Sequence, residues 1–222
     1  MAANSSPPTA APMNFHPPLT LQGHWVALVP LSMEHLPGLL QAGGSPDIWT
    51  FMRTGKHDTP SAMQGLVQDL LQLQAEGTDL PFTIFYRPHG QVAGMTRFLE
   101  IRRKDRGVEI GGTWLDSRLW RTPVNTEAKY LLLRHAFETE GCLRVQLKTD
   151  VRNVRSQRAI ERLGAKREGV LRKQFVLPDG HVRDSVYYSI TDDEWPGVKR
   201  RLEGFLAQDW QATALAGAGR PE

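Results

Sequence analysis

The most regular hydrophobic pattern lies at positions 143–151, where apolar side chains alternate with charged or amide side chains. This period of two predicts a strand with one buried face. Runs rich in β-branched and aromatic residues predict further strands at 25–31, 82–86, 91–100 and 108–115. Near the end of the chain, Pro-Asp-Gly separates the apolar runs 175–177 and 181–190, which predicts a hairpin.

Helical spacing and capping residues predict the other elements. Thr59 and Pro60 suit an N-cap and a first turn, and Leu66, Leu70 and Leu73 follow before Gly77. Further helices are predicted from Ser32 to Gln41, from Asn125 or Thr126 to Gly141, from Asn153 to Gly164, and from the capping-box pair Thr191 and Glu194 to about Leu206. Strands mixed with helices in this order indicate an α/β (α+β) protein built around a mixed sheet.

Composition sets the limits of the fold. The chain has 222 residues, enough for one domain, which we place at 19–208. The Pro/Ala-rich segment 1–18 and the segment 209–222 read as flexible tails, because they contain little that could be buried. A single cysteine, Cys142, excludes an intrachain disulfide and, together with the absence of an apolar span or signal segment, favours a cytoplasmic protein without a membrane partner.

A net charge of +3 permits an anionic ligand but does not indicate nucleic acid, because the arginines at 152–172 have no aromatic residues among them. The histidines show no metal-ligand spacing, so no metal is expected.

Two helix starts carry residues suited to phosphate binding. In the first, a strand leads through Arg118 and Arg121 into the helix near Asn125, and a helix N-terminus attracts anions. In the second, Asn153 opens a helix on which Ser156 shares a stripe with apolar residues, whereas Arg155 and Arg158 lie on the other side. The alternative is that the loop binds nothing and the arginines form a solvated helix face.

Taken together, these segments resemble the Gcn5-related N-acetyltransferase (GNAT) superfamily, especially its ribosomal-protein N-acetyltransferase branch. The residues that carry the resemblance are Glu109-Ile110-Gly111-Gly112-Thr113-Trp114-Leu115, Thr126-Glu127-Ala128, His135-Ala136-Phe137, Asn153, Ser156 and Leu163-Gly164-Ala165. The resemblance implies a mostly antiparallel sheet with helices on both faces and with acetyl-CoA held where the two middle strands splay apart. It also implies direct transfer of acetyl to a primary amine, either a protein N-terminus or a small molecule, by a monomer or homodimer.

The resemblance assigns most of the site. The implied cofactor-binding residues are Thr113, Trp114, Leu115, Arg118, Arg121, Thr122, Val124, Asn125, Thr126, Asn153, Arg155, Ser156 and Arg158. Glu109 is the candidate base that takes the proton from the amine, or else an ordinary carboxylate of the strand. Members of the family often have, at the position of Ile160, a tyrosine that acts as the general acid. Ser156 is therefore the remaining candidate to protonate the leaving sulfur or to hydrogen-bond the cofactor.

One departure concerns the pyrophosphate loop, in which the family usually has glycines. Here Pro123 and Asn125 stand at those positions, and proline has no N–H to offer a phosphate. Side chains of Arg121, Thr122 and Asn125 could replace that donor. The alternative is a catalytically silent module that keeps the fold and binds acyl-CoA or a partner.

Overall fold

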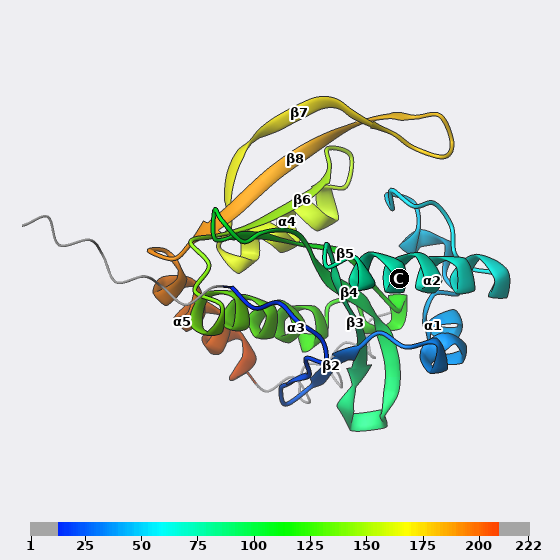
Figure 1. Cartoon of the computed structure of the whole chain (residues 1–222), viewed down its shortest axis with the longest axis horizontal. Helices are drawn as coiled ribbons and strands as arrows, with labels where there is room; N and C mark the ends of the chain where they lie inside the picture. Colours follow the sequence, from blue (N-terminus) through cyan, green and yellow to red (C-terminus); the bar gives the residue numbers. More distant parts are fainter. Residues whose placement is uncertain (1–12, 209–222) are drawn as a thin grey trace, which may run out of the picture.

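A computed structural model describes residues 13–208 of the chain (Figure 1). Its strands form one eight-stranded sheet in the order β1-β2-β3-β4-β5-β6-β8-β7. The strands are β1 (Leu21–Gln22), β2 (Val26–Pro30), β3 (Leu80–Tyr86), β4 (Gln91–Arg102), β5 (Gly107–Leu115), β6 (Arg144–Asp150), β7 (Lys166–Val176) and β8 (Val182–Thr191). The α-helices are α1 (Leu36–Ala42), α2 (Pro60–Ala75), α3 (Pro123–Arg134), α4 (Val154–Leu163) and α5 (Trp195–Leu206). Short 3₁₀ turns cover Met33–His35, Pro46–Ile48, Arg87–His89 and Ser117–Leu119, and a π turn, His135–Thr139, continues α3.

The sheet divides in its middle, between β5 and β6. These two strands are parallel, whereas all other neighbouring strands in the described sheet are antiparallel. They pair only at Gly107–Arg144, Val108–Val145 and Glu109–Gln146, although both continue for several more residues. Beyond Glu109 the strands therefore diverge, which confirms the predicted mixed sheet with a V-shaped opening.

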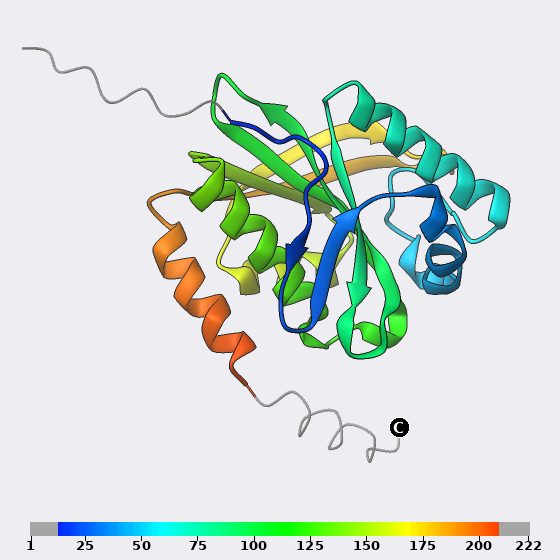
Figure 2. The same cartoon turned by 60° about the horizontal axis from the view of Figure 1, so that its bottom comes forward.

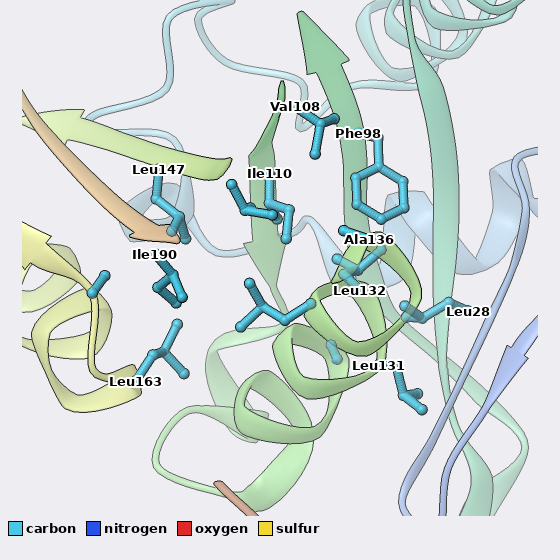
Figure 3. Packing of buried hydrophobic residues seen from close by; sticks show 14 of the residues in the cluster. Leu28, Phe98, Val108, Ile110, Leu131, Leu132, Ala136, Leu147, Leu163 and Ile190 are labelled. Carbon is cyan, nitrogen blue, oxygen red and sulfur yellow. The ribbon is translucent and has the colours of Figure 1, made fainter. Parts of the chain in front are cut away.

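Helices cover both faces of this sheet. On one face, α3, α4 and α5 pack on the main core, which includes Val108 and Ile110 of β5 and Leu131 and Leu132 of α3 (Figure 3). The packed pair α3 and α5 is seen most clearly in the turned view (Figure 2). On the other face, α1 and α2 enclose a second apolar cluster that includes Met95 and Trp114. The two cores explain why apolar residues occur on both sides of the central strands.

Among the predicted helices, α3 starts earlier than expected, before Asn125 or Thr126. The helix begins at Pro123, and Thr122 is its N-cap. Proline is favoured at the first helical position, because that N–H has no intrahelical partner and the ring already fixes φ. Pro123 therefore forms the helix start rather than interrupting the loop before it.

A long strand region was also missed. Residues 166–174 belong to the long strand β7, which the sequence pattern left unassigned because its outer side chains are mostly polar and exposed. Figure 1 shows β7 and β8 as a curved hairpin that arches towards the loop before α2. Pro178 of its turn lies against Gly55 of that loop. The hairpin thus extends the sheet over one end of the central opening.

The predicted flexible tail is wrong over residues 13–18. Met13 and Phe15 are buried in the main core, and the Phe15 ring lies 4.8 Å from that of Phe98. The Pro/Ala-rich composition of the whole segment outweighed these two apolar side chains in the prediction, although their burial stabilises the contact of the segment with the domain. Residues 1–12 and 209–222 lie outside the described part. Within residues 13–208, none of the helices is long and apolar enough to span a membrane.

Candidate active site

A cavity of about 930 Å³ opens where β5 and β6 separate. Its wall combines β5, β6, the start of α3, one side of α4, the loop after residue 48 and the β7–β8 hairpin. Because β6 diverges from β5 after Glu109, the backbone of β5 beyond this residue has one edge without a strand partner. Such an edge can hydrogen-bond an extended ligand as an added strand would.

Most of the predicted site residues are brought together in this wall. They are Glu109, Thr113, Trp114, Leu115, Arg121, Thr122, Asn125, Asn153, Arg155 and Ser156. Asn153 also caps α4, since its Oδ1 accepts a hydrogen bond of 3.0 Å from the Ser156 N–H. Arg155 stacks on the Trp120 ring, with its guanidinium carbon 3.6 Å from the ring centroid. The two helix starts recognised in the sequence therefore line one cavity.

Four other predicted cofactor residues lie outside the cavity wall. Arg118 forms a forked ion pair with Asp116, and Arg158 is exposed on α4. Val124 and Thr126 are buried, and the hydroxyl of Thr126 accepts a hydrogen bond of 2.6 Å from Arg162. Arg162 does line the cavity and joins α4 to the start of α3, a contact that no local sequence pattern indicates.

Glu109 lies on the face of β5 opposite to Val108 and Ile110, as the alternation predicts. It is only 1% exposed, so it is more deeply buried than expected. Its Oε2 accepts hydrogen bonds from Gln146 (2.6 Å) and Lys148 (3.0 Å), both on β6. Glu109 is thus a cavity-lining carboxylate at the point where the strands part, and it is held there by an ion pair.

Lys129 is a cavity-lining residue that sequence reasoning missed. It projects from α3 and donates hydrogen bonds to two neutral hydroxyls, those of Thr113 on β5 and Thr96 on β4. Among residues 13–208 no carboxylate lies within ion-pair distance of its Nζ. Burial without a counter-charge lowers the pKa of Lys129 to about 7.

This buried amine makes stability depend on pH. The unfolded chain keeps the ordinary lysine pKa of about 10.4, so between pH 7 and 10.4 it binds a proton that the folded protein does not. The free energy of unfolding should therefore increase as pH rises through this range, by as much as about 1.4 kcal/mol per pH unit. Lys129→Met should remove that slope, measured by denaturant unfolding at several pH values. Lys104→Met, at an exposed turn residue, is the control; equal slopes in all three proteins would contradict the prediction.

The cavity wall near Glu109 holds further residues that the sequence did not indicate. Arg53 comes from the loop after residue 48, Arg97 from β4, and Phe175 and Arg183 from the hairpin. These segments are far apart in the chain, and none contains a recognisable motif. Only the folded sheet places them around Glu109.

The splayed strands with a helix N-terminus at their opening now allow comparison with known proteins. Residues 26–166 match the family model described as the acetyltransferase (GNAT) domain. The chain belongs to the GNAT acetyltransferase family. This confirms the resemblance seen in the sequence, and the protein is an acetyltransferase of a family that uses acetyl-CoA.

Individual GNAT relatives support the same assignment. A solved structure from T. thermophilus, named as a proposed acetyltransferase, is 43% identical with a TM-score of 0.78, covering 85% of this chain and 97% of that one. The ribosomal protein uS5-alanine N-acetyltransferase of Escherichia coli is 26% identical over 155 residues, covering 67% of this chain and 77% of its own length. Mycobacterium smegmatis RimJ, solved in complex with CoA-disulfide, is 22% identical with a TM-score of 0.73, covering 87% of this chain and 97% of that one, and it shares the fold.

Proposed function

We propose that this GNAT enzyme transfers acetyl from acetyl-CoA directly to a primary amine in the cytoplasm, with a protein N-terminus as the acceptor. The observation that carries the proposal is the cavity between the diverging ends of β5 and β6, which reaches the N-terminus of α3. The relative that modifies the alanine of ribosomal protein uS5 supports a protein N-terminus over a small amine.

The cavity offers suitable partners for the pantetheine arm and the pyrophosphate of acetyl-CoA. The pantetheine arm would lie on the free edge of β5 at Thr113–Leu115, where backbone groups match its amides. The pyrophosphate would meet the N-terminus of α3, where the helix dipole and the cavity-lining side chains of Arg121, Thr122 and Asn125 favour negative charge. Asn153 and Arg155 would contact the cofactor from α4.

The chemical step needs a neutral amine and an acid for the leaving thiolate. The amine nitrogen would bond to the acetyl carbon while the carbon–sulfur bond breaks, and the nitrogen would lose a proton. Glu109 is our candidate to receive that proton, directly or through water, because it is the carboxylate of the cavity wall. Ser156, at the head of α4, is the candidate partner for the sulfur or for the pantetheine.

Arg121 should matter more here than in a glycine-rich loop, since Pro123 offers no N–H. Arg121→Ala should weaken acetyl-CoA binding by about 1.5–3 kcal/mol, or roughly 10- to 100-fold, as expected for a hydrogen bond to a charged group. Arg121 has a left-handed backbone (φ 64°), and alanine keeps a Cβ there, so the variant should fold like the parent. Calorimetric titration with acetyl-CoA at two salt concentrations measures the effect.

The control for this titration is Arg103→Ala, which removes an exposed arginine outside the cavity wall. The parent's affinity should fall with added salt, because a partly exposed ion contact is screened. If Arg121→Ala and Arg103→Ala both bind like the parent, Arg121 points to solvent and the helix N-terminus suffices.

The proposed function is tested by following thiol release from acetyl-CoA with a panel of N-terminal peptides and small amines, next to thermal stabilisation by acetyl-CoA. Stabilisation with amine-dependent thiol release on a peptide supports the proposal. Stabilisation without release on any amine would instead identify the silent acyl-CoA-binding module. Release only with small amines would move the acceptor to that class.

A further inference from the structure

The acceptor end of the cavity is unusually rich in positive charge. Four cationic side chains from separate segments line it, namely Arg53, Arg97, Lys148 and Arg183. Within the described lining, Glu109 is the one carboxylate. The cavity wall is thus far more positive than the whole chain, whose net charge is only +3.

Three of these cations gather around one aromatic ring. The guanidinium carbon of Arg53 lies 4.7 Å from the Phe175 ring centroid, Lys148 Nζ lies 5.6 Å from it, and the guanidinium carbon of Arg183 lies 5.9 Å from it. The ring faces attract cations and hold them close together despite their mutual repulsion. Phe175 therefore marks the centre of the positive cluster.

Two of the four cations already have a counter-charge. Lys148 is paired with Glu109 at 3.0 Å, and Arg97 is paired with Asp79 at 3.0 Å. Within residues 13–208, Arg53 and Arg183 have no carboxylate within ion-pair distance. The excess positive charge of the cluster thus resides on these two arginines.

Arg183 is the more informative of the pair, because it is only 6% exposed. Its Nε donates a hydrogen bond of 3.0 Å to Ser185 Oγ. Arg183 interacts electrostatically with Asp150, but the two carboxylate oxygens of Asp150 are bound by Arg152 at 3.0 and 2.8 Å. A buried guanidinium without its own carboxylate is costly, and a bound anion would offset that cost. The forked donors of arginine match a carboxylate in particular.

We propose that the acceptor carries a carboxylate close to the amine that is acetylated, and that Arg53 and Arg183 bind this carboxylate beside Phe175. The proposal rests on the proposed N-acetyltransferase function and narrows its substrate class. The carboxylate could belong to an acidic residue next to a peptide N-terminus or to a free amino acid, since both present the same chemistry.

The charges also give the acceptor one orientation. Glu109, where β5 and β6 part, attracts an ammonium group and repels a carboxylate, whereas the two arginines do the opposite. The amine would therefore point into the opening between the strands, towards the thioester. Arg53 comes from the loop that the β7–β8 hairpin approaches, so both walls of this end contribute one arginine to the same anion (Figure 1).

The test compares peptides that differ only in their second residue, Ala-Glu, Ala-Gln or Ala-Lys at the N-terminus, together with free alanine and alaninamide, of which only alanine has a carboxylate next to its amine. We expect kcat/KM to be at least tenfold higher for Ala-Glu than for Ala-Gln, with Ala-Lys lowest, and added salt should reduce the ratio. Acetylation of alanine in preference to alaninamide, with all peptides inert, would support the same anion site and assign it to a small molecule.

Variants then connect the preference to the arginines. Arg53→Gln, at an exposed position where folding is not at risk, should bring the Ala-Glu to Ala-Gln ratio close to one while leaving the KM for acetyl-CoA unchanged. Arg53→Lys should retain part of the preference, and Arg103→Gln, outside the cavity wall, should retain all of it. Arg183→Gln should act like Arg53→Gln if circular dichroism shows that it folds.

The outcomes distinguish a failure of the proposed carboxylate site from a failure of the proposed acetyltransferase function. Equal rates on acidic and neutral acceptors would overturn the anion site and leave the acetyltransferase proposal intact. A clear acidic preference that survives in Arg53→Gln and in folded Arg183→Gln would also overturn it. If no amine is acetylated at all, the proposed function fails and this inference fails with it.

Discussion

Glu127→Gln is expected to lower the thermal midpoint of unfolding by about 6–12 °C, from a loss of about 3 kcal/mol or more. The Glu127 carboxylate is 5% exposed and accepts backbone N–H groups from three consecutive residues at the start of β2. His24 donates at 2.8 Å, Trp25 at 2.6 Å and Val26 at 2.7 Å. It thereby joins α3 to the edge of the sheet.

The size of the effect follows from the chemistry of the amide. Glutamine has nearly the same shape, but one of its two acceptor oxygens is replaced by an NH₂ group that would face backbone donors. At least one buried N–H then loses its partner, and the remaining bonds lose their charge assistance. Differential scanning calorimetry measures the midpoint.

A matched control is Glu76→Gln, at an exposed carboxylate that accepts one hydrogen bond from Gln72. It should change stability by no more than about 0.5 kcal/mol. If Glu127→Gln unfolds at the same temperature as Glu76→Gln, the carboxylate does not tie α3 to β2. Glu127 would then need another role within the Thr126-Glu127-Ala128 segment.

Glu109→Gln should reduce turnover about 100-fold while leaving acetyl-CoA affinity unchanged. The substitution preserves shape and keeps an oxygen that can accept from Lys148 or Gln146, but it removes the group able to take the proton from the amine. Steady-state rates across a pH range, with calorimetric titration of acetyl-CoA, separate the chemical step from binding.

Breaking a buried ion pair could itself lower activity, so the control is Asp79→Asn. Asp79 is 8% exposed and paired with Arg97 at 3.0 Å, but it is not part of the cavity wall. Its variant should be destabilised without a comparable fall in turnover. If Glu109→Gln keeps the parent's rate and pH profile, Glu109 is only a structural partner of Lys148, and water or another group removes the proton.

The site residues that could be predicted from the sequence sit on β5, whose segment carries the family resemblance, or at recognisable helix starts. Thr122, Asn125, Asn153 and Ser156 belong to such starts, and all of them line the cavity. Arg53, Lys129, Arg162 and Arg183 line it too, yet each lies in a segment whose pattern shows nothing more than a loop, a helix or a strand. Lys129, in particular, follows Ala128 on an otherwise apolar stretch of α3, and no local signal marks its amine as buried.

Local periodicity and capping determined which segments form the main strands and helices, because alternation, N-caps and turn residues act over a few neighbouring positions. The same periodicity determined that Glu109 points away from Val108 and Ile110. Only the tertiary structure decided that β5 and β6 separate after Glu109, that Met13 and Phe15 enter the core, and that arginines from the loop before α2 and from β8 surround Phe175. These features depend on contacts between residues far apart in the chain. Which of these side chains are buried, and which charges lie close together, is determined only when helices pack on both faces of the sheet.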